Sequence, residues 1–94
     1  MYSESLFKPP ITSLIKAGKV ILSPNEEVGK HMTDKKEEIL VILKGTATLI
    51  IDGKSAELKE GEIYFINEGK NHNVINRHAD ELEYVYVVGM INQI

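Results

Sequence analysis

Cysteine is absent from the 94-residue chain, so disulfides and thiol chemistry are both excluded. Any metal site must therefore use nitrogen and oxygen ligands. Long apolar runs are also missing, since no stretch approaches the roughly 20 residues of a membrane-spanning helix. The N-terminus, Met1-Tyr2-Ser3-Glu4, lacks the basic and then apolar segments of a signal peptide. We therefore expect a cytoplasmic protein that contacts no membrane.

Basic residues are too few and too scattered for a nucleic-acid-binding surface. The chain has 11 Lys and Arg against 14 Asp and Glu, and its formal net charge is −3. Nucleic-acid binding needs clustered Lys and Arg, because these displace counterions from the phosphates. The composition, 43% hydrophobic and 27% charged, is that of one ordinary globular domain with a single core. We therefore expect no nucleic-acid partner.

The apolar runs are short, rich in β-branched residues, and separated by turn signals every 8–12 residues. Asp52-Gly53 is a strong hairpin signal, because both residues suit the positive φ angles of a two-residue turn. Helices are disfavoured, since glycine interrupts the runs and Val, Ile, Tyr and Thr dominate them. The pattern predicts an all-β sandwich or barrel. The predicted strands cover residues 19–22, 38–43, 46–51, 55–58, 62–66, 73–76 and 82–88.

The N-terminal segment is predicted to differ from the rest of the chain. Pro9-Pro10 interrupts regular structure, so we expect residues 1–10 to be a loose or partner-bound arm. We assign residues 1–17 to an N-terminal arm and residues 18–94 to one barrel. Closing the barrel removes most exposed sheet edges, and a strand added by a second copy can cover the rest.

Two histidines and one glutamate are predicted to meet at one end of the barrel. His31 and Thr33 share a face of an extended segment, because strand side chains alternate. Glu38 opens the next strand, and antiparallel pairing of the two segments would place it near His31. His72 opens a later strand. Two imidazoles and a carboxylate from separate strands are a plausible ligand set for a divalent transition metal.

The same alternation predicts the lining of a pocket. If Glu38 faces inward, so do Leu40 and Ile42, whereas Val74 and Asn76 share the face of His72. A buried carboxylate without a partner is costly and calls for a cation or hydrogen-bond donors. The apolar interior predicts a partly hydrophobic ligand with one polar or anionic group at the metal.

The spacing of these residues resembles the two motifs of the cupin family. The first motif, G-x5-H-x-H-x3–4-E-x6-G, is matched by His31, Glu38 and Gly45. The second, G-x5-P-x-G-x2-H-x3-N, is matched in four positions. These four are Gly61, Gly69, His72 and Asn76. The resemblance covers residues 18–88 and implies a double-stranded β-helix, the cupin jelly-roll barrel, with a metal inside it.

Three positions depart from the motifs. Thr33 replaces the second histidine, Asn25 stands at the first glycine and Asn67 at the proline. Thr33 is a possible weak ligand, although a structural role is the simpler reading. The remaining two-histidine, one-carboxylate set resembles that of non-heme iron oxygenases, and Fe, Mn, Ni, Co or Zn would fit it.

Structural roles that involve no metal are also open for these residues. His31 and His72 could be polar residues at strand ends, and Glu37 rather than Glu38 could face inward. Tyr64, Phe65, Tyr84 and Tyr86 fit the core or a dimer interface, and one tyrosine could line the pocket.

The resemblance also implies a homodimer, with residues 11–16 as the candidate for an exchanged strand. Three function classes remain open: a metal-binding protein with a small organic ligand, a metal-dependent enzyme (dioxygenase, isomerase or decarboxylase), and a metal-free ligand-binding or regulatory module. No general base can be identified, so the sequence does not assign catalytic residues or decide whether the chain is an enzyme.

Overall fold

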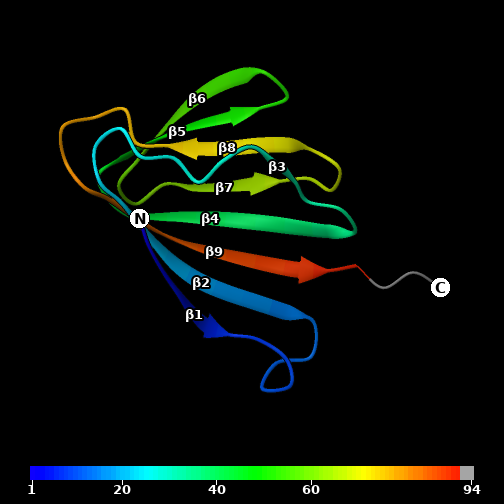
Figure 1. Cartoon of the computed structure of the whole chain (residues 1–94). Coiled ribbons are helices and arrows are strands. Elements are labelled where there is room, and N and C mark those ends of the chain that lie inside the picture. Colours follow the sequence, from blue (N-terminus) through cyan, green and yellow to red (C-terminus); the bar gives the residue numbers. More distant parts are fainter. Residues whose placement is uncertain (92–94) are drawn as a thin grey trace.

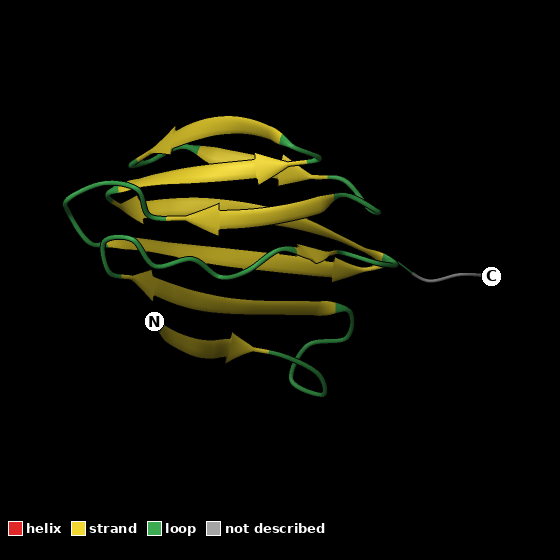
Figure 2. Cartoon of the chain, turned by 45° about the horizontal axis from the view of Figure 1, so that its top comes forward, coloured by secondary structure: helices red, strands yellow, loops and turns green. Residues whose placement is uncertain are grey.

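The chain forms two facing antiparallel β-sheets (Figure 1), and the computed structural model describes residues 1–91. The last three residues of the predicted barrel, 92–94, lie outside this range. Only strands, loops and turns occur in the described residues (Figure 2), which contain no helix able to cross a membrane. The strands are β1 (Tyr2–Phe7), β2 (Ile15–Leu22), β3 (His31–Met32), β4 (Lys36–Lys44), β5 (Thr46–Ile51), β6 (Lys54–Lys59), β7 (Ile63–Ile66), β8 (Asn71–Ile75) and β9 (Leu82–Met90).

The strand order shows a jelly roll. One sheet runs β1-β2-β9-β4-β7 and the other β3-β8-β5-β6. Consecutive strands therefore pass from one sheet to the other at several points, as Figure 1 shows for β4 and β5. The Asp52-Gly53 hairpin between β5 and β6 has both residues at positive φ, 47° and 80°, as the sequence predicts. The all-β jelly-roll prediction is confirmed.

The N-terminal segment is more ordered than predicted. Strand β1 pairs with β2 of the same chain, so residues 2–7 are an edge strand and not a loose arm. Pro9-Pro10 does end this strand, but a proline pair does not prevent the residues before it from pairing. The predicted boundary between residues 17 and 18 falls inside β2, because this strand begins at Ile15. Exchange of the segment with a second copy stays a prediction.

The core lies between the two sheets and follows the alternation of side chains. On β4, Glu38, Leu40 and Ile42 are buried, whereas Glu37 and Ile39 are exposed. Glu38, and not Glu37, therefore faces inward, as the sequence predicts. The buried apolar residues form one cluster: Val20, Leu22, Leu40, Ile42, Ala47, Leu49, Leu58, Ile66, Val74, Leu82 and Tyr84.

Gly45, which joins β4 to β5, is predicted to be the least replaceable turn glycine. Its φ is 84°, and a Cβ there would lie 2.5 Å from the carbonyl oxygen of Glu81. Gly53 has a similar φ of 80°, but a Cβ there would meet nothing within 4 Å. We expect Gly53→Ala to cost about 1–2 kcal/mol through backbone strain alone. Gly45→Ala should cost about 1–3 kcal/mol more, because a backbone atom must move. Urea denaturation of both variants measures the difference, and equal losses would contradict the proposed clash.

Candidate metal centre and cavity

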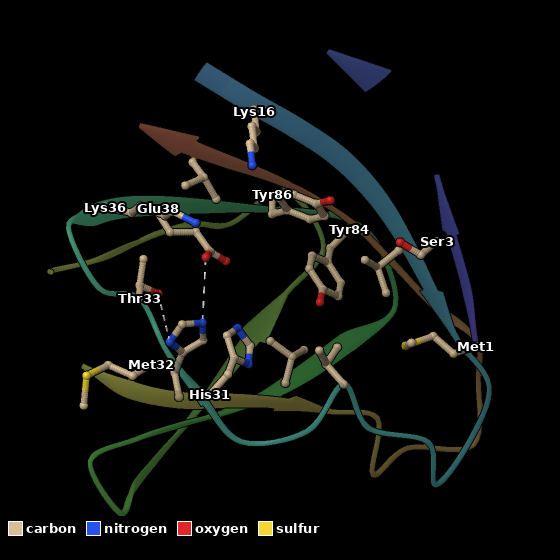
Figure 3. Close-up of a pocket in the computed structure, with 15 residues that line it drawn as sticks. Met1, Ser3, Lys16, His31, Met32, Thr33, Lys36, Glu38, Tyr84 and Tyr86 are labelled. Carbon is tan, nitrogen blue, oxygen red and sulfur yellow. Dashed lines mark hydrogen bonds and ion pairs between the residues drawn. The ribbon is translucent and has the colours of Figure 1, made fainter. Parts of the chain in front are cut away.

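The three predicted ligands come together between the two sheets. His31 on β3 lies directly opposite His72 on β8, with ring centroids 4.1 Å apart and planes at 62°. Glu38 reaches them from β4 in the facing sheet, and its Oε1 lies 3.7 Å from Nε2 of His72 (Figure 3, dashed line). One ligand atom of each residue lies within 4.8 Å of the others.

The route by which these residues meet differs from the prediction. Strand β3 does not pair with β4, because β3 has only two residues and belongs to the other sheet. Its partner is β8, and the chain changes sheets in the turn between Thr33 and Lys36. Glu38 therefore faces His31 across the interior and not along a shared strand pair.

Both imidazoles are held by the carbonyl oxygen of the residue two positions earlier. Nδ1 of His31 lies 2.9 Å from the Gly29 oxygen, and Nδ1 of His72 lies 3.3 Å from the Lys70 oxygen. A carbonyl can only accept a hydrogen bond, so each Nδ1 carries the proton and donates it. Each Nε2 is then left with a free lone pair. This arrangement of the second ring nitrogen is typical of metal-binding histidines.

Burial keeps the charges in this cluster low when no cation is bound. It lowers the pKa of His72, which favours the neutral imidazole that a metal requires. It also raises the pKa of Glu38, because the carboxylate loses solvent, although His31 and Lys36 oppose this shift. A buried carboxylate that lacks a close cation is thus a destabilising element of the site.

An orphaned atom shows that the cluster fits a metal ion. Nε2 of His72 is buried and has no hydrogen-bond partner among the described residues, since Glu38 is beyond hydrogen-bond distance. An unpaired buried polar atom costs roughly 1–3 kcal/mol. Imidazole and carboxylate ligands bind zinc-like ions at about 2.0–2.2 Å, so opposite ligands are at most about 4.4 Å apart. The cluster needs only a small contraction to reach that geometry.

Thr33 contacts the histidine pair from another side. Its side chain is buried, and Oγ1 lies 3.5 Å from Nδ1 of His72, the nitrogen that faces the Lys70 carbonyl. The hydroxyl thus contacts the His72 ring on the Nδ1 side, whereas Nε2 faces Glu38. This placement supports the structural reading of Thr33.

A cavity of about 380 Å³ opens beside the three ligands (Figure 3), a volume suited to a small organic molecule. Of the predicted lining residues, Val74 lies on its wall. Leu40 and Ile42 do not, because they lie deeper in the core cluster. Asn76 does not either: it is fully buried, and its amide nitrogen donates to the carbonyls of Leu22 and Asp80. The prediction for these three residues is therefore corrected.

The sequence left open that one tyrosine lines the cavity, but it did not predict the two lysines that also do so. Lys16, Lys36, Tyr84 and Tyr86 all line the cavity from the five-stranded sheet. Lys36 could have been found, since it precedes Glu38 by two positions and shares its face. Lys16 could not, because it precedes the predicted strand and only the pairing of β2 with β9 turns it inward. Tyr84 has its pKa raised by burial, and its hydroxyl stays protonated and available as a donor.

Gly18 shapes the cavity wall opposite the histidines. It pairs with Tyr86 on β9, and a Cβ at Gly18 would collide with the outer end of the Tyr86 ring. The outer end of the ring therefore lies over the backbone of β2 at Gly18. The missing side chain at Gly18 leaves room for Tyr86 at the wall and keeps the cavity open.

Residues 18–88 match the Cupin domain family. The chain belongs to the cupins. A curated relative of this cupin, the oxalate-binding protein of Thermotoga maritima, is 31% identical over 67 residues. The match covers 71% of this chain and 55% of the relative, so the cupin spans about half of that protein.

Solved structures support the same fold. A predicted oxalate decarboxylase from Thermotoga maritima superposes with a TM-score of 0.82 at 26% identity, over 95% of this chain and 79% of the other. The Cnp3 cupin domain of Schizosaccharomyces pombe gives 0.86 at 17% identity, over 94% and 63%. A protein from Thermus thermophilus also gives 0.86, at 18% identity over 98% and 85%. The last two likenesses concern the fold alone.

Proposed function

We propose that this cupin binds a divalent transition metal through His31, Glu38 and His72 and takes a small carboxylate ligand beside it. The orphaned Nε2 of His72, facing the buried Glu38 carboxylate, is the observation that carries the proposal. Fe, Mn, Ni, Co or Zn would suit this mixture of imidazole and carboxylate. The bound ion would act as a Lewis acid toward an oxygen of the ligand.

The chain's own residues explain how such a ligand is selected. The cavity walls are apolar at Val20, Val28 and Val88, whereas lysines and tyrosine hydroxyls line other parts of it. A ligand with an apolar middle and an anionic end fits this distribution. The oxalate-binding relative supports a carboxylate ligand. Turnover by a metal-dependent enzyme is the alternative, which the predicted oxalate decarboxylase structure favours.

The ligand proposal is tested by melting temperatures measured with small carboxylates, with and without added Mn²⁺. We expect carboxylates to raise the melting temperature only when the metal is present. Gly18→Ala should abolish this carboxylate effect, because the displaced Tyr86 ring enters the cavity, while the rise caused by Mn²⁺ alone remains. Carboxylate shifts that do not depend on metal would favour the metal-free module instead.

We also propose that the cupin forms a homodimer through the outside of its five-stranded sheet. Strand register places a continuous set of apolar side chains there, which we call the outer apolar face. It consists of Phe7, Ala17, Val87, Ile39, Phe65, Val85, Val41 and Ile63. Phe65 and Ile63 are 52% and 66% exposed, and every side chain of β1 is exposed although several are apolar. A second copy suits this face, because two sheets pack well face to face.

Sedimentation equilibrium at a protein concentration well above the expected dissociation constant should give the mass of two chains. Phe65→Lys and Ile39→Lys should give one chain, since each places a charge in the apolar contact. Ser55→Lys is the matched control, because Ser55 is exposed on β6 of the four-stranded sheet and lies outside the outer apolar face. A wild-type mass of one chain would rule out the dimer.

A further inference from the structure

The cavity carries an excess of positive charge. Lys16 enters it from β2 and Lys36 from β4, and neither forms an ion pair within residues 1–91. Among the described residues, Glu38 is the only negatively charged lining side chain. The chain as a whole is negative, with net charge −3, so this excess is local. A divalent cation would add further positive charge. The cavity is therefore suited to a ligand with more than one negative charge.

Lys16 and Glu38 of the metal cluster lie on the same wall of the cavity, one strand to either side of Val88. Lys16 pairs with Val88 on β9, and Val88 pairs with Glu38 on β4. All three side chains line the cavity, and Figure 3 shows the Lys16 ammonium pointing toward its interior. Two strand spacings separate the backbones of Lys16 and Glu38, which is about 10 Å. A ligand that meets both groups must therefore have a certain length.

This separation limits the kind of anion. The two carboxylates of oxalate are bonded directly, so oxalate held at the metal cluster presents no distant anionic group. Succinate and glutarate place two and three carbons between their carboxylates. Their apolar middle would lie against Val88, whose side chain stands between Lys16 and Glu38. The cavity volume of about 380 Å³ accommodates molecules of this size.

We infer that the cavity takes a small dicarboxylate, with one carboxylate at the His31–Glu38–His72 cluster and the other on the Lys16 ammonium. The inference rests on the proposed metal binding and adds the class of ligand. Lys16 then determines specificity, because it distinguishes a dicarboxylate from a monocarboxylate of equal length. Lys36 raises the affinity for anions in general, since it shares the inward face of β4 with Glu38.

Calorimetric titration of the Mn²⁺-loaded protein with butyrate, oxalate, succinate and glutarate tests this inference. Succinate or glutarate should bind about tenfold tighter than butyrate, as one added charge-assisted hydrogen bond implies. Lys16→Met should remove this advantage and weaken butyrate binding only slightly, whereas Lys16→Arg should retain most of it. Lys19→Met is the matched control, because it removes the same charge from the same strand, and Lys19 does not line the cavity.

The outcomes separate the inference from the proposed function. Equal affinities for butyrate and succinate, or dicarboxylate binding that Lys16→Met leaves unchanged, would overturn the role of Lys16 while metal binding stands. Oxalate binding that is tightest and independent of Lys16 would also overturn it. Elemental analysis that finds no Mn²⁺ in the loaded wild-type protein would remove the proposed function and the inference together. Circular dichroism checks that each lysine variant retains its β-structure.

Discussion

Replacing His72 with alanine is expected to remove the stoichiometric metal that wild-type protein should retain after loading and gel filtration. The substitution deletes the Nε2 lone pair that faces Glu38 and leaves two ligands, one of which is on a two-residue strand. Loss of a group that only orients a ligand costs about 10–100-fold in metal affinity. Loss of the ligand itself should exceed this range. Elemental analysis of the filtered protein measures the occupancy.

Two further histidine variants test whether the loss of metal is specific to the proposed ligands. His31→Ala should also lower the occupancy, and its fold is less at risk because His31 is exposed and His72 is fully buried. His78→Ala should leave the occupancy at its wild-type value. His78 is an exposed histidine whose Nε2 lies 3.0 Å from Glu57, outside the cluster. Full occupancy in both His31→Ala and His72→Ala would contradict the proposed metal centre.

Binding of a transition metal should raise the melting temperature by roughly 10 °C or more, and a chelator should reverse the rise. At a free metal concentration about 100 times the Kd, binding stabilises the native state by about 2.7 kcal/mol. For a domain of this length, each kcal/mol corresponds to about 4–8 °C. Differential scanning calorimetry with and without Zn²⁺ or Mn²⁺ measures the shift.

Glu38→Gln should change the stability of the metal-free protein and that of the metal-bound protein in opposite directions. In the metal-free protein at neutral pH it replaces a buried carboxylate whose pKa is raised by burial, so we expect stabilisation of about 1 kcal/mol. With metal present, the neutral amide is a weaker ligand and most of the rise in melting temperature should be lost. Glu37→Gln on the outward face of β4 is the control. A metal-free Glu38→Gln protein that is less stable than wild type would show that the carboxylate has a stabilising partner.

The alternation of side chains along a strand accounts for most of what the sequence predicted about the site. Strand side chains alternate with a fixed period, so the burial of Glu38 with Leu40 and Ile42 could be read from the sequence once one of them was placed. The spacing of His31, Glu38 and His72 predicted their meeting without any knowledge of distance. The pairing between β2 and β9 joins residues about 70 positions apart, and this pairing positions Lys16. Such long-range register has no local signature, and Lys16 was missed for that reason.

The fold was predicted well where turns are local and poorly where the chain changes sheets. The Asp52-Gly53 hairpin and strand β5 follow from residue preferences within a few positions. The pairing of β3 with β8 does not, because a two-residue strand shows no alternation. Leu40 and Ile42 were expected to line the pocket for a related reason. Their inward direction could be predicted, but their depth below the cavity depends on how the facing sheet covers them.

The position of Glu38 across from the two histidines also bears on the motion of the protein. Glu38 belongs to one sheet and His31 and His72 to the other, so an ion bound by all three would join the sheets at this end as a cross-link does. In the metal-free protein that end is held by a two-residue strand and contains a buried atom without a partner among the described residues. Amide hydrogens of β3 and the start of β8 should then exchange with solvent fastest when metal is absent. Opening of this end would set the rate at which an ion leaves.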